Sequence, residues 1–198
     1  MIKIKRNNLD NALAERTHKE MLEVLMDPKS AGPDTHYFMI RGGSEKKNIT
    51  IWQSGLAGNE YIKTYGHYHI NDFLETYKIL FGEGIVLLQV RKTDEKGLPL
   101  DDEIDYIKAI FVKAGNEIQI PKNAGHLMVN IGKSWLITAD NSPVNFGKSE
   151  EASWPAHADY KPVKKMRGFA YYVVKKDNHP VFIKNPNYKN TPEIIIEK

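Results

Sequence analysis

The sequence predicts a mainly β protein, built as a sandwich or a barrel and preceded by one N-terminal helix. After residue 34 the chain consists of short runs rich in β-branched and aromatic residues, at a spacing of about 8–12 residues. Turn signals such as Gly42-Gly43, Gly82-Glu83-Gly84 and Gly115-Asn116 separate these runs. No helical periodicity lies between them, so a layered β architecture is favoured over alternating strands and helices.

A helix is predicted over residues 10–26, because apolar residues there share one broad face when they are spaced as in a helix. This face would comprise Leu13, Met21, Leu22, Leu25 and Met26. Asp27-Pro28 and Gly32-Pro33 then end the element. We accordingly divide the chain into an N-terminal helical extension (1–34), a barrel domain (35–188) and a C-terminal tail (189–198).

Strands are predicted wherever a β-rich run is bounded by turn residues. The expected strands cover residues 35–42, 47–53, 60–68, 74–81, 84–92, 104–112, 117–120, 125–130 and 135–139. Residues 141–165 are interpreted as a long polar loop. A last pair of strands is expected over residues 168–175 and 180–184.

Composition excludes several classes of function. The 198 residues include 28 Lys and Arg against 25 Asp and Glu, mixed along the chain, so we expect no nucleic-acid partner. Cysteine is absent, which excludes disulfide scaffolds, cysteine nucleophiles and Cys-ligated metals. No apolar run approaches the roughly 18 residues of a membrane span, and no apolar region typical of a secretory signal follows the first residues. We therefore expect a cytoplasmic protein without a membrane partner.

Three of the seven histidines form a pattern typical of a metal site. His67 and His69 are two apart in a predicted strand, so both imidazoles project from the same face. Glu75 follows on the next strand, and His126 could complete the set from a facing strand. Three imidazoles and a carboxylate suit Fe, Mn, Ni, Zn or Co. We expect one divalent metal ion, whose identity the sequence does not decide.

The spacing around these residues resembles the two motifs of the cupin superfamily. The first motif is the Gly-flanked His67-x-His69 followed by Glu75, and the second contains Gly115, Pro121, His126 and Asn130. Asn123 stands where a glycine is usual, and Asn is the residue that best replaces Gly at positive φ. The resemblance implies the cupin fold, a double-stranded β-helix or jelly-roll barrel.

Within that superfamily the chain is similar to the cupin-type glucose-6-phosphate isomerases of archaea. The similarity covers residues 35–188 and is strongest over residues 61–69, 75–84 and 120–132. It implies that the metal ligands are His67, His69, Glu75 and His126. It also implies a sugar-phosphate substrate and a homodimer.

The same resemblance implies the residues that contact the substrate. Thr50, Thr64 and Gly66 would surround the phosphate, and Tyr77 would lie beside the sugar. In the segment before residue 161, only His157 and Tyr160 match the family's loop. Tyr65 stands where the family motif often has a lysine.

An aldose–ketose isomerase moves a proton between C1 and C2 of an open-chain sugar, which a single carboxylate can do. Glu75 is the candidate base, and Tyr77 is the second candidate catalytic residue. A hydride shift is the competing mechanism, and the sequence does not choose between them. Two other functions stay open: another metal-dependent cupin enzyme, such as a different sugar isomerase, an epimerase or a dioxygenase, or a sugar-binding cupin without catalysis.

Overall fold

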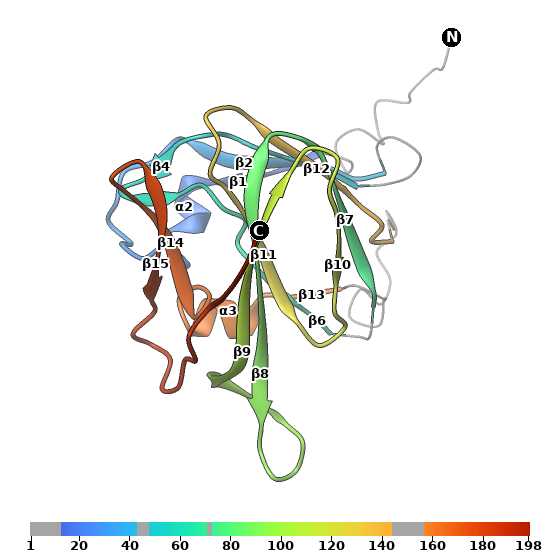
Figure 1. Ribbon diagram of the computed structural model, residues 1–198, viewed down its shortest axis with the longest axis vertical. Coiled ribbons are helices and arrows are strands. Elements are labelled where there is room, and N and C mark those ends of the chain that lie inside the picture. The colour runs from blue at the N-terminus through green and yellow to red at the C-terminus, as the bar shows by residue number, and fades with distance from the viewer. Residues whose placement is uncertain (1–12, 43–47, 71–72, 144–156) are drawn as a thin grey trace.

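The computed structural model describes residues 13–42, 48–70, 73–143 and 157–198, and these residues form a mainly β fold. The largest sheet has six strands, in the order β1 (Leu13–Thr17), β2 (Thr35–Ile40), β3 (Asn48–Trp52), β12 (Leu136–Asp140), β7 (Glu75–Phe81) and β10 (Glu117–Ile120). The second sheet has four, in the order β11 (Gly125–Asn130), β8 (Glu83–Thr93), β9 (Pro99–Lys113) and β16 (Ile195–Glu197). The two sheets face each other and form a barrel, so the predicted mainly β architecture is confirmed (Figure 1).

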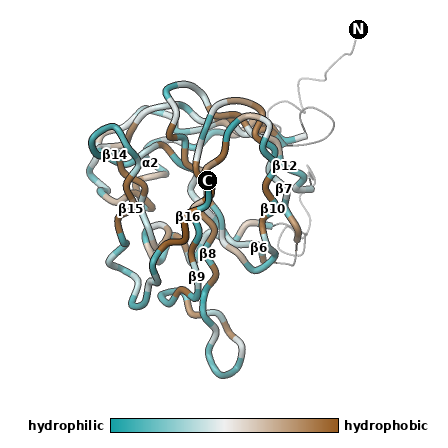
Figure 2. The backbone as a smooth tube through the Cα atoms, viewed as in Figure 1, coloured by the Kyte–Doolittle hydropathy of each residue, from teal (hydrophilic) through white to brown (hydrophobic). Residues whose placement is uncertain are grey.

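The described residues also form two smaller sheets and two short helices. One sheet contains β15 (His179–Lys184), β14 (Tyr171–Lys176), β5 (Glu60–Tyr61) and β4 (Leu56–Ala57), and a second pairs β13 (Ala158–Asp159) with β6 (Tyr68–His69). The helices are α2 (His18–Met21) and α3 (Lys161–Lys165). The β8–β9 hairpin projects beyond the barrel, and its tip is hydrophilic (Figures 1 and 2).

Side-chain alternation along the strands builds the barrel interior. In β7, Glu75, Tyr77 and Ile79 are buried, whereas Lys78 between them is exposed. Residues 84–90 of β8 are all buried. An uninterrupted buried run of this kind is typical of a strand covered on both faces. The main core continues through Trp52, Ile85, Leu87, Leu127 and Phe169.

The predicted N-terminal helix over residues 10–26 is wrong. Residues 13–17 form strand β1, which pairs antiparallel with β2, and only residues 18–21 are helical; residues 10–12 lie outside the described part of the chain. A capping box ends the strand and starts α2, because the Thr17 side chain accepts from the Glu20 amide while the Glu20 carboxylate accepts from Thr17. Leu13, assigned to the apolar face, is 58% exposed.

Two further segments differ from the sequence prediction. The strand expected over residues 60–68 is broken into β5 and β6. Between them, Lys63 and His67 each form a single bridge to β11, with Val129 and His126 respectively. The loop expected over residues 141–165 contains β13 and α3, and its residues 144–156 lie outside the described residues.

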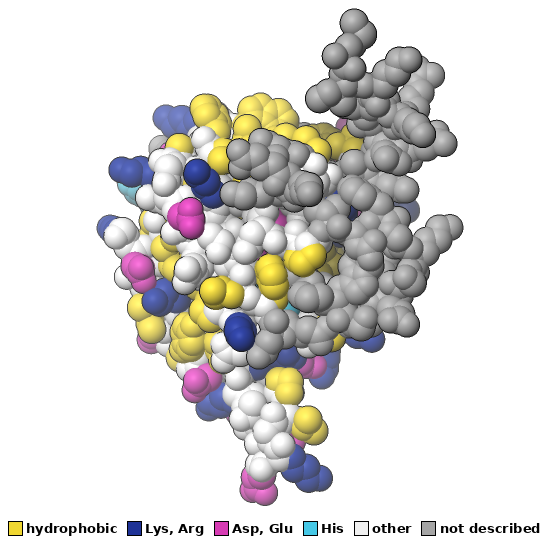
Figure 3. Space-filling model, turned by 90° about the vertical axis from the view of Figure 1, so that its right-hand side faces the viewer, with side chains coloured by type: hydrophobic (Ala, Val, Ile, Leu, Met, Phe, Trp, Pro, Cys, Tyr) yellow, Lys and Arg dark blue, Asp and Glu magenta, His cyan; other side chains and the backbone are white. Residues whose placement is uncertain are grey.

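Segments on both sides of the expected domain boundaries belong to the barrel sheets. β1 is a strand of the six-stranded sheet, and β16 pairs in parallel with β9. Among the described residues, no helix is long and apolar enough to cross a membrane. Lys and Arg side chains are interspersed with Asp and Glu on the face seen in Figure 3.

Candidate metal centre

Strand pairing brings His67, His69 and His126 together. The backbone of His67 exchanges two hydrogen bonds with that of His126, with N···O distances of 3.2 and 3.0 Å. Gly66 precedes this pair at φ +82°, and a Cβ there would lie 2.8 Å from Cε1 of Phe169. Only glycine fits both conditions, so Gly66 fixes how the chain enters the site.

The side chains of His67, His69, Glu75 and His126 converge inside the barrel, with one ligand atom from each within 4.8 Å of the others. The ring centroids of the three histidines are 4.3 to 5.2 Å apart. Oε2 of Glu75 lies 2.9 Å from Nε2 of His126 and 3.4 Å from Nε2 of His69. The four residues that the sequence predicts as ligands are therefore gathered in one cluster.

This cluster fits a cation because its buried polar atoms are unpaired. Both ring nitrogens of His69 and of His126, together with Oε2 of Glu75, are buried and have no hydrogen-bond partner among the described residues. Leaving such an atom unpaired costs about 1–3 kcal/mol. One ion would take a nitrogen from each ring and the carboxylate oxygen. Imidazole and carboxylate donors suit several divalent transition metals.

The cluster also favours the deprotonated forms of His67 and Glu75. Burial, helped by His126, His69 and His157, lowers the pKa of His67 well below its ordinary value. Burial alone would raise the pKa of Glu75, but the adjacent histidines outweigh it and hold that pKa well below its usual range. Neutral imidazoles and an ionised carboxylate are the forms that bind a metal.

A second layer of hydrogen bonds holds Glu75. Its Oε1 accepts from the Ser142 hydroxyl at 2.8 Å, and the Ser142 amide donates to Asp140 at 2.9 Å. Asp140 also accepts from the Asn48 side chain at 3.0 Å. Burial and the nearby Glu75 carboxylate raise the pKa of Asp140 to about 6. The orientation of Glu75 thus depends on a strand end at residues 140–142.

Tyr77 and Tyr160 border the cluster on different sides. The ring of Tyr77 lies 5.5 Å from that of His126, and burial raises the Tyr77 pKa well above its ordinary value, so its hydroxyl stays protonated. The Tyr160 ring lies 5.4 Å from that of His67. His157 is near enough to His67 to affect its pKa, and its carbonyl accepts from the Ile70 amide at 2.9 Å.

The expected phosphate residues are distributed around the cluster. Gly66 adjoins His67 directly, and the hydroxyl of Thr64 accepts from the Met128 amide at 3.0 Å. Thr50 lies further away, on β3, opposite Thr138 of β12. Because Asp140, two residues along β12, pairs with Tyr77, Thr50 and Tyr77 share the inner face of the sheet with β12 between them.

Sequence reasoning missed Asp140, Ser142 and Arg16. The first two follow the strand predicted over residues 135–139, where a polar run after a strand reads as a loop. Arg16 falls inside the incorrectly predicted helix. Its guanidinium lies 5.7 Å from the ring centroids of both Tyr65 and Tyr160. The Tyr160 ring in turn contacts that of His67. Strand alternation over residues 14–16 was the one available signal for Arg16.

Comparison with known proteins gives both a family and more distant structural neighbours. The sequence model of the family described as Glucose-6-phosphate isomerase (GPI) matches residues 34–190. A glucose-6-phosphate isomerase of Thermococcus litoralis is 26% identical over 141 residues, or 71% of this chain, and the chain spans 62% of that relative's length.

Solved structures with some likeness include a predicted oxalate decarboxylase from Thermotoga maritima, at 14% identity and TM-score 0.39, covering 71% of this chain and 96% of that one. Another is the oxalate decarboxylase formate complex from Lactobacillus farciminis, at 19% identity and TM-score 0.36, covering 57% of this chain and 30% of that one.

Proposed function

Because this chain belongs to the glucose-6-phosphate isomerase family, we propose that it interconverts glucose 6-phosphate and fructose 6-phosphate. The observation that carries this proposal is the convergence of four ligand atoms within 4.8 Å of one another in the barrel interior. Family membership, through a match over residues 34–190, supports the substrate pair. The ligand cluster supports a reaction that depends on a metal.

We infer that one divalent ion is held by His67, His69, Glu75 and His126. The unpaired buried atoms of three of these residues support this assignment, and Fe, Mn, Ni and Zn all accept such donors. When bound, a divalent ion of this kind acts as a Lewis acid and stabilises negative charge that develops on the sugar oxygens.

Glu75 is the proposed base. Its carboxylate takes the proton from C2 of open-chain glucose 6-phosphate and returns a proton to C1, while the hydroxyl proton of O2 moves to O1. The products balance as fructose 6-phosphate, with the carbonyl now at C2. The lowered pKa of Glu75 keeps it ionised at neutral pH, and the Ser142 hydroxyl holds the carboxylate in orientation.

The neutral, buried hydroxyl of Tyr77 is proposed to donate a hydrogen bond to the sugar. We place the phosphate near Thr50, Thr64, Gly66, His157 and Tyr160. The contact between the Tyr160 ring and His67 supports this placement. A sugar bound at the metal ligands would have its phosphate end beside them, where Tyr160 lies.

We further propose that the protein acts as a homodimer. Strand β16 leaves Ile195 and Ile196 about half exposed at 52% and 51%, and it is the edge strand of its sheet. Exposed apolar edges tend to pair with another chain. Light scattering should give twice the mass of one chain, and a monomer mass at micromolar concentration would contradict this proposal.

The deciding experiment measures interconversion of the two sugar phosphates by protein that is first stripped with a chelator and then reloaded with Mn, Fe, Ni or Zn. Activity should vanish on stripping and return with at least one metal. Glu75→Gln should lower kcat by about 10²–10⁴-fold. His179→Ala is the matched control, because His179 is an exposed histidine on β15 and its loss should change nothing.

A folded, metal-loaded protein that is inactive with every metal would contradict the substrate assignment. Another cupin reaction, or sugar binding without catalysis, would then be favoured. Glucose 6-phosphate carrying deuterium at C2 tests the mechanism separately. Release of deuterium to solvent supports proton transfer by Glu75. Full retention of deuterium at C1 would instead indicate a hydride shift.

A further inference from the structure

Arg16 brings a positive charge to the inner face of the six-stranded sheet. It pairs with Tyr37 of β2, which pairs in turn with Trp52 of β3, so the three side chains share one face. Tyr37 and Trp52 are buried, which identifies this face as the interior. Along the described strands of this sheet, no other Lys or Arg falls in register on that face. Thr50 shares it, two residues from Trp52.

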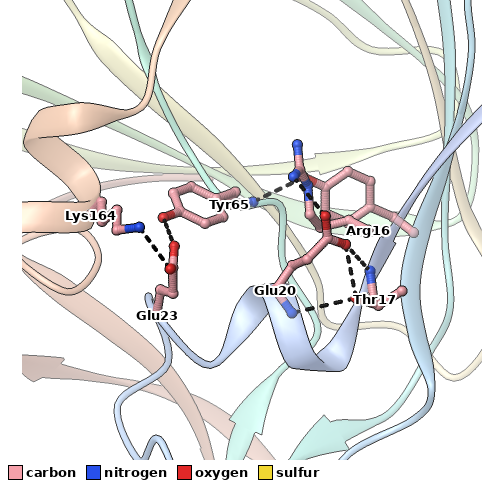
Figure 4. A network of polar contacts seen from close by, with 7 residues as sticks. Arg16, Thr17, Glu20, Glu23, Tyr65 and Lys164 are labelled. Atoms are coloured by element: carbon pink, nitrogen blue, oxygen red, sulfur yellow. Dashed lines mark hydrogen bonds and ion pairs between the residues drawn. The ribbon is translucent and has the colours of Figure 1, made fainter.

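The guanidinium of Arg16 lies beside the aromatic wall of the metal centre. Its carbon is 5.7 Å from the ring centroids of both Tyr65 and Tyr160, and the Tyr160 ring contacts His67. Figure 4 shows the Tyr65 hydroxyl bonded to Glu23, at 2.8 Å, and the Tyr65 amide donates to the Tyr37 hydroxyl at 3.3 Å. The Tyr37 hydroxyl also interacts with the guanidinium.

Several donors of this guanidinium remain available. Nη1 contacts Oε1 of Glu20 at 3.3 Å, whereas Oε2 of Glu20 accepts from the Thr17 amide and hydroxyl, both at 2.8 Å. Nε of Arg16 is buried and has no hydrogen-bond partner among the described residues. A guanidinium carries five N–H donors and stays charged in proteins. Glu20 therefore accepts from only some of the N–H donors of Arg16.

Resting on the proposed function, we propose that Arg16 binds the phosphate group of the substrate and thereby selects phosphorylated over free sugars. The phosphate is attached four carbons beyond C2, so its partner must lie beside the metal centre and not in it. Arg16 meets this condition, and its planar fork suits bidentate contact with phosphate oxygens. The Thr50 hydroxyl, on the same inner face, is a second donor for the same group.

The test compares Arg16→Met and Arg16→Lys with the wild-type chain, using inorganic phosphate and a hexitol 6-phosphate as probes. The hexitol lacks a carbonyl, so calorimetric binding is measured without turnover. Arg16→Met should weaken binding of both probes by about 10- to 100-fold, the loss of a charge-assisted contact. Arg16→Lys should bind both probes more weakly than the wild type and more tightly than Arg16→Met. In the isomerase assay, KM should rise with little change in kcat.

Arg91→Met is the matched control. Arg91 is also ion-paired, with Asp101 at 2.6 Å, and lies 4.1 Å above the ring of Tyr68. Tyr68 sits between His67 and His69 in sequence and so points to the opposite face. Arg91→Met should bind both probes as the wild type does.

Equal binding by wild type and Arg16→Met would overturn the phosphate role, even if the enzyme isomerises sugars. The phosphate role is also overturned if Arg91→Met loses as much affinity, or if Arg16→Lys binds as weakly as Arg16→Met while melting at the wild-type temperature. A wild type that binds neither probe would contradict it as well. Inactivity with every metal, by contrast, tells against the isomerase proposal and is read from a different assay.

Discussion

Residues 60–69 contribute to two buried polar clusters that differ in how fully their atoms are paired. In the first, Glu60 and Lys63 are 2% and 3% exposed and form an ion pair. Lys63 also donates to the Val24 carbonyl at 2.7 Å, and Glu60 accepts from the Met26 amide at 2.8 Å. In the second cluster, the nitrogens of His69 are buried without a hydrogen-bond partner among the described residues.

The difference separates a structural role from a binding role. The paired cluster ties residues 24–26 to the barrel, and its Lys63 ammonium lies 5.1 Å from the ring centroid of Tyr172. Every charge there has a partner, so nothing is left for a ligand. Unpaired buried groups cost stability and therefore call for an explanation, of which a bound ion is one. Both clusters are buried and carry charged groups, so only the pairing of their atoms distinguishes them.

The largest effect is expected from breaking the paired cluster. Lys63→Met leaves the Glu60 carboxylate buried without its cation, which should lower the free energy of unfolding by about 3–5 kcal/mol. Urea denaturation measures the change. The double variant Glu60→Gln/Lys63→Met should recover part of the loss, because no buried charge remains. Turnover per folded molecule should be unchanged, and a folded Lys63→Met protein with impaired catalysis would break the comparison.

The ligand cluster could be predicted from sequence because its signals are local. His67 and His69 alternate within one predicted strand, and the residues around Glu75 and around His126 each resemble a short cupin motif. Most strand positions were also predictable, since β-rich runs are bounded by glycines. The helix over residues 10–26 was not, because apolar spacing alone cannot reveal that β2 offers residues 13–17 an open edge to pair with.

Contacts between distant residues that no sequence motif marks were beyond prediction. Ser142 meets Glu75 across 67 positions, and Glu60 meets the Met26 amide across 34. No local pattern marks such pairs, because the fold itself brings them together. The paired and unpaired clusters could therefore be told apart only in the structure, although both lie on one short segment.

His36 is intermediate between the paired and the unpaired cluster, because only one of its ring nitrogens has a partner among the described residues. The pH dependence of stability tests its role. It is fully buried, its Nε2 lies 2.8 Å from Nδ1 of His18, and its Nδ1 has no partner among the described residues. Burial, with the nearby His18 and Lys63, lowers the His36 pKa to about 4. The unfolded chain therefore binds the proton more readily. The resulting stability is fully present above pH 6.5 and is lost as pH falls towards 4.

That loss should reach about 3 kcal/mol between pH 7 and pH 4, taking about 1.4 kcal/mol for each pKa unit. Asp140 acts in the opposite direction, because its pKa is raised to about 6. The measurement is therefore the difference between the wild type and His36→Gln, by denaturation at each pH. The variant should lose less stability on acidification, and parallel profiles would show that His36 does not titrate.

Metal addition should affect only the unpaired cluster. At a free metal concentration of 100 times Kd, a ligand bound by the native state alone adds about 2.7 kcal/mol of stability. Wild type and Lys63→Met should gain similar amounts on adding Mn or Zn to stripped protein, whereas His126→Ala should gain much less. Equal stabilisation of all three proteins in thermal unfolding would mean that the ion binds elsewhere.

The smallest effect is expected at Ser142, which belongs to the ligand cluster without contributing a ligand atom. Ser142→Ala removes the hydroxyl that donates to Oε1 of Glu75 and leaves the backbone contact to Asp140 in place. Loss of such an outer contact typically weakens metal binding by about 10-fold, which corresponds to about 1.4 kcal/mol. Competition with a chelator measures the affinity. Ser30→Ala is the control, because its hydroxyl donates to the Asp27 carbonyl in an exposed turn. An unchanged affinity in Ser142→Ala would mean that the ring nitrogens alone orient the carboxylate, and the cluster would then be independent of the strand end at residues 140–142.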